Sequence, residues 1–144
     1  MSEADKATIR RIPLEVINEG RIDVIDDVLT GDYREHMPVP GFTPDREGLK
    51  GFLRAMRSAF PDIRYTVLRE IAEGDTVVQY VSVTGTMRGD FAGMKATGKS
   101  ATWTEMHIVH MRDGLAAEHW GIVDMLTMLQ ELGLVPAPGV AEAA

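Results

Sequence analysis

Apolar residues recur at helical spacing through most of the first 60 residues of the chain. A helix is predicted over 3–19, and Pro13 inside it predicts either a kink or a later start. Gly20 follows as the end of this helix. A second, shorter helix is predicted over about 22–29, because its apolar residues again fall three and four positions apart.

A third helix has the clearest start signal in the sequence. Thr43 can cap it, Pro44 suits its first position, and Pro61 ends it. The segment 32–42 before it is rich in Pro and Gly and contains His36. This segment is therefore predicted to be a loop.

From residue 63 onward, apolar and polar side chains alternate with the period of a β-strand. The predicted elements are strands over 63–72, 76–88, 99–112 and 115–123, followed by a helix over about 125–132. Helices that precede strands, without alternating with them, predict an α+β fold. We expect a curved, mostly antiparallel sheet packed against the helices.

The predicted sheet has apolar residues on both of its faces. In strands 76–88 and 99–112, apolar side chains occur at odd and even positions alike. Helices can cover one face, and a second subunit is the natural cover for the other. The sequence therefore predicts a homodimer that buries the face carrying Met106 and Ile108.

A turn signal at Asp113-Gly114 joins the last two predicted strands. We expect a type I turn followed by Gly114 in the left-handed region, which makes a bulged turn and pairs Met111 with Leu115. The turn matters because it sets which residues of the two strands face each other.

Under this register, four residues meet on one face of the hairpin. His107 lies opposite His119, and Glu105 lies opposite Gly121. A two-residue turn is the alternative, and it slips the register by one and sets His107 opposite Trp120. The grouping of the four residues depends on the first register.

The composition excludes several classes of function. The 144 residues carry a formal charge of −7, without a basic stripe interleaved with aromatics, so no nucleic-acid partner is expected. No apolar run approaches the roughly 20 residues that span a bilayer, so no membrane partner is expected either. The chain has no cysteine, which excludes disulfides and thiolate metal sites and favours a cytoplasmic location.

The length predicts one domain with a sizeable core. We place this domain at 1–135. The remaining segment, 136–144, is rich in Pro and Ala and is predicted to be a flexible tail.

Short motifs along the chain resemble those of the SnoaL-like polyketide cyclases, a family with the NTF2-like cone fold. The resemblance extends over about residues 5–134 and implies this fold. The matching pieces are Phe60-Pro61-Asp62, Gly74-Asp75, Gly85, Gly89, Gly93-Met94, Asp113-Gly114 and Leu129-Gln130-Glu131-Leu132-Gly133.

The resemblance also implies a chemistry. Members of the family close a polyketide ring by an intramolecular aldol reaction without metal or organic cofactor, using an aspartate on the last strand as acid/base. This aspartate falls on Gly121, while the family's pocket histidine falls on His107 and its polar neighbour on Glu105. Asp124 lies three residues further on, where it is also a suitable helix cap.

Two further positions follow from the resemblance. The loop residue that lines the cyclase pocket falls on His36, and Met87 stands where these cyclases carry a histidine. Both are candidate substrate-binding residues, together with His119 and Trp103. Trp103 is most simply explained as a core or interface residue.

Glu105 and His107 are the candidate catalytic residues. Glutamate is rarely buried without a partner. A cavity, where desolvation favours the protonated form of a carboxyl group, would suit Glu105 to the acid/base role of the missing aspartate. The alternatives are an exposed edge glutamate in an ion pair and a histidine bonded within the core.

His107, His119 and Glu105, with or without His36, would also suffice for a zinc or iron site of three protein ligands. Because the resembled family uses no cofactor, we expect neither metal nor cofactor. The leading hypothesis is thus a cofactor-independent enzyme of acid/base type that acts on a polyketide-like or other apolar oxygenated molecule. Aldol cyclisation, isomerisation and hydration remain open. The alternative is a non-catalytic dimer that binds a small ligand.

Overall fold

A computed structural model describes residues 2–136 of the chain. The predicted tail over 136–144 thus lies, apart from Pro136, outside the described residues. The elements, in order, are α1 (Ser2–Arg11), η1 (Ile12–Ile17), η2 (Ile22–Val24), α2 (Ile25–Val28), β1 (Leu29–Glu35), α3 (Arg46–Ala59), β2 (Arg64–Glu73), β3 (Thr76–Thr86), β4 (Ser100–Arg112), β5 (Leu115–Val123) and α4 (Met125–Glu131).

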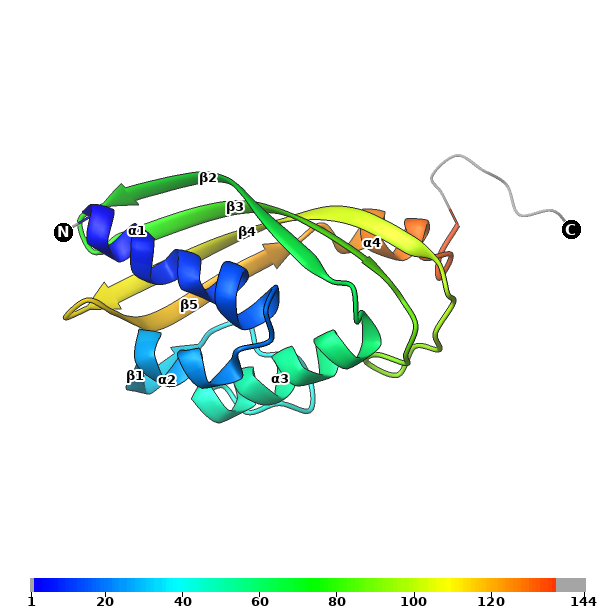
Figure 1. Cartoon of the computed structure of the whole chain (residues 1–144), viewed down its shortest axis with the longest axis horizontal. Helices are drawn as coiled ribbons and strands as arrows, with labels where there is room; N and C mark the ends of the chain where they lie inside the picture. The colour runs from blue at the N-terminus through cyan, green and yellow to red at the C-terminus, as the bar shows by residue number, and fades with distance from the viewer. Residues whose placement is uncertain (1, 137–144) are drawn as a thin grey trace, which may run out of the picture.

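The strands form one curved sheet in the order β1-β5-β4-β3-β2. All neighbours are antiparallel except β1 and β5, which run parallel. Helices α1, α2 and α3 lie on the concave side of this sheet, and α4 lies near the opposite end of the molecule from the N-terminus (Figure 1). The predicted α+β class and the predicted mostly antiparallel sheet are both confirmed.

The predicted first helix changes its winding at Pro13. The α-helix ends at Arg11 and continues as a π-helical turn, in which the amide of Asn18 donates to the carbonyl of Pro13 at 3.0 Å. Proline has no amide hydrogen, so the ordinary α-helical ladder cannot continue through it. The kink expected from the sequence therefore takes the form of a wider turn.

The third helix is capped two residues later than predicted. Asp45 is the N-cap, and its side chain accepts a hydrogen bond from the amide of Gly48 at 2.9 Å. Thr43, the predicted cap, donates its hydroxyl to Asp45 instead, at 2.7 Å. The resulting helix buries Leu53 and Met56 against the sheet.

The segment predicted as a loop over 32–42 begins with a strand. Strand β1 reaches Glu35 and pairs with β5, setting Arg34 beside Glu118 and Glu35 beside His119. The prediction was wrong because the strand is a short edge strand containing Gly and Asp, which are poor strand formers, and because its partner lies more than eighty residues away in the sequence. This strand delivers Glu35 to the inner face.

The turn between β4 and β5 differs from the predicted one. Asp113 and Gly114 have φ values of 52° and 79°, and Arg112 pairs with Leu115, so the turn has two residues and is of the primed type. Two positive φ values suit the right-handed twist of the strands better than the type I turn that we expected.

Strand β5 contains a β-bulge shortly after the turn. Met111 pairs with Ala116 and His110 with Glu118, which leaves Ala117 as the extra residue. The amide of Met111 donates instead to the carbonyl of Asp75 in the neighbouring turn, at 2.7 Å. The bulge thus shifts the pairing of the two strands by one more residue.

Both predicted registers are therefore wrong: His107 lies opposite Gly121, and His119 lies opposite Val109. The turn and the bulge each shift the pairing by one residue. Because side chains alternate with a period of two, the combined shift returns each residue to its predicted face. His107 and His119 thus share the inner face as diagonal neighbours.

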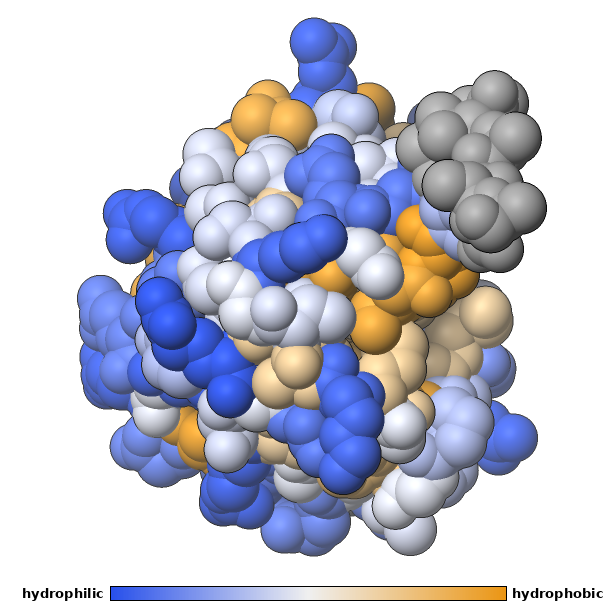
Figure 2. Space-filling view, turned by 90° about the vertical axis from the view of Figure 1, so that its right-hand side faces the viewer, coloured by the Kyte–Doolittle hydropathy of each residue, from blue (hydrophilic) through white to orange (hydrophobic). Residues whose placement is uncertain are grey.

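The outer face of the sheet remains apolar and open. Met106 and Ile122 are 48% and 74% exposed, and the same face carries the half-exposed Ile71, Tyr80, Ile108 and Trp120. At the end of the molecule near α4, by contrast, hydrophilic side chains surround a smaller hydrophobic patch (Figure 2). No helix among residues 2–136 is long and apolar enough to cross a membrane.

Candidate active site

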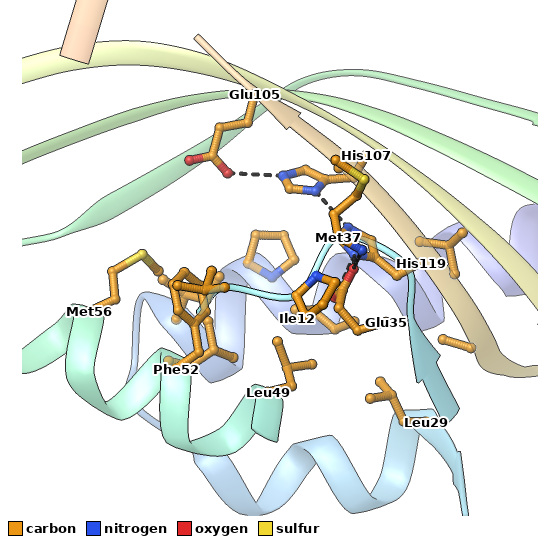
Figure 3. A pocket seen from close by; sticks show the side chains of 18 of the residues that line it. Ile12, Leu29, Glu35, Met37, Leu49, Phe52, Met56, Glu105, His107 and His119 are labelled. Atoms are coloured by element: carbon orange, nitrogen blue, oxygen red, sulfur yellow. Dashed lines mark hydrogen bonds and ion pairs between the residues drawn. The ribbon is translucent and has the colours of Figure 1, made fainter. Parts of the chain in front are cut away.

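A pocket of about 200 Å³ lies between the concave face of the sheet and the helices beneath it. Most of its lining is apolar, as is typical of small-molecule sites. Figure 3 shows its floor on α3 and the first helical segment, with the sheet above. The apolar lining includes Ile9, Ile12, Leu29, Leu49, Phe52 and Val81.

The ionisable groups of the lining are concentrated on the sheet. They are two carboxylates, two imidazoles and two phenols, and neither lysine nor arginine lines the pocket in the described part of the chain. These six residues are Tyr33, Glu35, Tyr65, Glu105, His107 and His119. A pocket with this content is a poor site for anions.

Four of these groups form a continuous hydrogen-bonded chain. His107 Nε2 lies 3.0 Å from Glu105 Oε1, and His107 Nδ1 lies 2.8 Å from His119 Nε2. His119 Nδ1 lies 2.7 Å and 2.8 Å from the two carboxylate oxygens of Glu35. The order is thus Glu105, His107, His119, Glu35, along the dashed lines of Figure 3.

Glu105 ends the chain at its deepest point. Its side chain is 6% exposed. The hydroxyl of Tyr65 donates to Oε1 at 3.0 Å, and Trp103 Nε1 donates to Oε2 at 2.8 Å. Together with His107, three donors satisfy this buried carboxylate and fix its orientation.

Glu35 ends the chain at the other side of the pocket, with a side chain 11% exposed. It accepts from the hydroxyl of Tyr33 at 3.0 Å and from the amide of Met37 at 3.1 Å. Burial alone would raise the pKa of Glu35. The hydrogen bond and charge of His119, with the donors Met37 and Tyr33, nevertheless hold this pKa below its usual value.

The two tyrosines are neutral hydrogen-bond donors. Burial, followed by the adjacent negative charge of Glu35, raises the pKa of Tyr33. Burial and the charge of Glu105 do the same for the pKa of Tyr65. Neither phenol competes for the role of base near neutral pH.

Gly121 is required by the imidazole pair. A Cβ atom at this position would lie 2.9 Å from His119 Cε1 and 3.0 Å from His107 Nδ1. Such distances are shorter than carbon atoms tolerate. Gly121 therefore leaves open the space that the two rings occupy.

The structure brings Glu105, His107 and His119 together as predicted, but it does not bring His36 to them. His36 stacks on Trp120 with ring centroids 4.3 Å apart, and its Nε2 lies 2.9 Å from Glu118. It is absent from the pocket lining because β1 ends at Glu35 and the next residue turns to the other side. The expectation that His36 lines the pocket is thus not met.

Met87 and Trp103 are core residues in this structure. Met87 is fully buried and Trp103 is 3% exposed, and neither belongs to the pocket lining. Trp103 acts on the site only through its hydrogen bond to Glu105. Asp124 caps α4, with its side chain accepting from the amide of Thr127 at 3.2 Å.

Sequence reasoning missed Glu35 and its two companions, Tyr33 and Tyr65. The single signal for Glu35 was its alternation with Tyr33 in a segment that was read as a loop. Residues that meet through a parallel edge strand leave no local pattern of spacing. Among residues 2–136, no three or more His, Cys, Asp or Glu side chains are grouped so that they could hold a metal ion.

The fold and site together define a class: a small cone-shaped α+β protein with a mostly apolar pocket and acid/base groups on its sheet. Residues 7–132 match the family model of the SnoaL-like polyketide cyclases. The chain therefore belongs to this family, and the family assigned by resemblance is confirmed.

Solved structures agree with this assignment. TsrD from Streptomyces laurentii superposes with a TM-score of 0.85 at 26% sequence identity, covering 92% of this chain and 97% of that one. IdmH from Streptomyces antibioticus, a proposed polyketide cyclase, superposes with a TM-score of 0.77 at 33% identity, covering 90% and 98%. The predicted NTF2-like cone is thus confirmed.

A more distant relative shares the fold alone. AclR from Streptomyces galilaeus, a proposed hydroxylase, superposes with a TM-score of 0.83 at 24% identity, covering 99% of this chain and 87% of that one. The comparison with curated proteins found no match.

Proposed function

We propose that this protein is a cofactor-independent enzyme that closes a ring in, or otherwise isomerises, a polyketide-like molecule by acid/base chemistry. The observation that carries the proposal is the contact between Glu105 and His107, at 3.0 Å in a mostly apolar pocket. A buried carboxylate beside an imidazole is a common arrangement for proton transfer. Membership of the family supplies the polyketide-like substrate class.

The reaction needs a proton to leave carbon and to return to oxygen. A base removes the proton next to a carbonyl group, and the electron pair of the C–H bond forms an enolate. The enolate carbon attacks a second carbonyl carbon of the same molecule, and the oxygen of that carbonyl takes a proton back. Substrate and product are isomers, so no oxidant or reductant is needed.

Each catalytic residue has a distinct part in this scheme. Glu105 is held by three donors and keeps His107 in position, while the ring of His107 is partly exposed and lines the pocket. His107 is therefore the group that transfers the proton. His119, bonded to His107 through Nε2 and to Glu35 through Nδ1, positions the His107 ring.

The electrostatics of the pocket favour an uncharged substrate. Glu35 and Glu105 supply two negative charges, and the lining provides no lysine or arginine to pair with an anionic ligand. Bringing a carboxylate or phosphate into this site would cost both desolvation and repulsion. We expect a ketone or an ester as the ligand and not a free acid.

The experiment uses an aromatic methyl ester that carries a 1,3-diketone side chain, together with the matching free acid. A 2-oxopropyl group on the neighbouring ring carbon supplies the ketone that the diketone carbon attacks to close a six-membered ring. Protein treated with a chelator and desalted should convert the ester to a product of equal mass. In deuterium oxide it should also accelerate exchange of the proton between the two carbonyl groups. The free acid should bind at least about tenfold more weakly, because one extra negative charge must enter the pocket.

Binding of the ester without exchange and without conversion would contradict the proposal and identify a small-ligand-binding protein. Conversion that is lost on chelation and restored by a metal ion would contradict its cofactor independence. Equal affinity for the ester and the free acid would contradict the charge argument alone.

We also propose that the protein is a homodimer. The apolar outer face of the sheet, with Met106, Ile108 and Ile122 exposed, supports this proposal because patches of this kind are uncommon on monomers. A second copy is the natural occupant, since apolar sheet faces pack well on one another. A stable dimer of this kind should bury more than about 1,000 Å².

A further inference from the structure

The central contact of the site joins two imidazole nitrogens, His107 Nδ1 and His119 Nε2, at 2.8 Å. This distance is that of a hydrogen bond, which requires one proton between the two atoms. The two rings lie with their centroids 5.0 Å apart and their planes inclined by 26°. The number of protons that this arrangement can hold follows from its neighbours.

Both outer nitrogens of the pair face carboxylates. His107 Nε2 faces Glu105, and His119 Nδ1 faces Glu35. An ionised carboxylate can only accept hydrogen bonds, so each outer nitrogen must carry a proton. Each ring then has its inner nitrogen left for the contact with the other ring.

The central contact can hold zero, one or two protons. With none, two lone pairs face each other at 2.8 Å and repel. With two, both rings are imidazolium ions whose N–H groups point at each other, which the same distance forbids. With one proton the contact is a hydrogen bond, and the chain of four groups holds three protons and a net charge of −1.

The charged and polar groups around the two rings support a count of one proton in the central contact. Glu35 and Glu105 flank the pair, the phenols of Tyr33 and Tyr65 are neutral donors, and the helices facing the pocket contribute only uncharged lining residues. Gln79, a further lining residue, donates to Glu70, and Glu70 is paired with Arg10. Two carboxylates beside the pair thus stabilise one positive charge on it.

We infer that the proton exchanged with the substrate is the one between His107 Nδ1 and His119 Nε2, and that Glu35 is the second positioning residue of the site. This inference rests on the proposed function and goes beyond it. The form with two protons in the chain is the base, and the form with three is the acid. The pair takes one proton from the substrate carbon and returns one to the product oxygen.

This arrangement accounts for the glycine at position 121. The two rings occupy the space that any side chain at this position would need. Glu35 and Glu105 supply the negative charge from the two ends of the pair. The two carboxylates thus lie at the ends of the hydrogen-bonded chain, and the exchanging proton lies between two ring nitrogens.

The test is a titration of the substrate-free full chain, labelled with ¹⁵N in its histidine rings and followed by NMR. The four histidines are assigned with single His→Gln variants. As the pH is lowered, His107 and His119 should take up one proton together in a single step that both rings report. Two independent steps, one for each ring, would overturn the inference.

Glu35→Gln removes one carboxylate charge and retains an acceptor. It should move the shared uptake of the pair to lower pH by about one unit or more. Glu118→Gln is the matched control, because Glu118 contacts His36 and His110 on the outer face. The control should shift only these two rings. An equal effect of both variants on the inner pair would overturn the role of Glu35.

Gly121→Ala is the second variant, with Gly31→Ala as its control, because a Cβ at Gly31 meets no atom within 4 Å. Gly121→Ala should separate the rings, so that each titrates alone, while Gly31→Ala leaves the shared step unchanged. A shared step that survives in Gly121→Ala would overturn the inference.

These outcomes are separable from those of the proposed function. A shared step in a protein that converts no ketone would contradict the proposed function but support the shared proton. Conversion that depends on Glu105 in a protein whose rings titrate independently would support the proposed function and overturn the inference.

Discussion

Two histidine–carboxylate clusters lie on opposite faces of the same two strands. The inner cluster joins His107 and His119 to Glu105 and Glu35. The outer cluster joins His36 and His110 to Glu118, and His110 also to Asp75 at 3.0 Å. The residue types and the distances are alike, so these do not distinguish the two clusters.

The surroundings distinguish them. The inner carboxylates are 6% and 11% exposed, while Glu118 and Asp75 are 36% and 69% exposed. Asp75, and then Glu118, raises the pKa of His110 against the effect of burial, but water screens such exposed pairs. Chemistry at a histidine therefore depends on the face it occupies more than on its partner.

The largest expected difference between the clusters is in turnover. Glu105→Gln keeps the size of the side chain but removes its charge and one of its two acceptor oxygens, so the rate should fall by roughly 10²–10⁴. Glu118→Gln in the outer cluster should leave the rate within about twofold. The ester conversion assay measures both, and near wild-type turnover in Glu105→Gln would assign the chemistry elsewhere.

Replacement of Gly121 by aspartate tests whether the carboxylate that the resemblance to the cyclases implies at this position can act here. The Cβ alone approaches both rings within 3.0 Å, so Gly121→Asp should separate them and lower turnover by about tenfold or more. Gly31→Asp, with its open surroundings, is the matched control. A gain in rate for Gly121→Asp would show that the imidazole pair does not do the work of the aspartate.

Substitutions on the outer face of the sheet should change dimer association and not turnover. Ile108→Glu places a charge in the proposed dimer interface and should weaken association by at least about tenfold. Leu126→Glu on α4, at a comparably exposed apolar position, should leave the dimer intact. Light scattering of the wild type that gives the 15.9 kDa monomer at micromolar concentration would refute the dimer itself.

The smallest expected effect is on the pH dependence of stability. The folded-state pKa of Glu35 lies below its usual value of 4.5, so its contribution is present above that pH and is lost as the pH falls through the folded pKa. Glu35→Gln should remove on the order of 1 kcal/mol of this acid dependence. Urea unfolding at pH 7 and pH 4 measures it, and an unchanged difference would mean that Glu35 is not stabilised in the folded state.

The sequence was sufficient for the elements that follow their own periodicity. The helix at 46–59 and the strands from 64 to 123 occur close to their predicted bounds, because each buries a continuous stripe of its own residues. Strand β1 was not predictable in this way. Its seven residues hold Gly and Asp, and a partner distant in the sequence determines its conformation.

The sequence was sufficient to predict the face of the sheet on which each site residue lies. It was not sufficient to predict which of these residues contact each other. The period of two placed Glu105, His107, His119 and Gly121 on one face whatever even shift the hairpin adopted. The actual contacts depended on a primed turn and on a bulge that the amide of Met111 stabilises through Asp75. Glu35 was missed because its strand, β1, was not predicted.

Ala117, the extra residue of the bulge, sets which of the later residues of β5 face the pocket. If Ala117 paired with His110 and the bulge were lost, every later position of β5 would shift by one and turn to the other face. His119 would face outward, and Trp120 would point into the pocket. The bulge at this alanine, which lies outside the pocket lining, therefore determines which side chains of β5 face the pocket and which face outward.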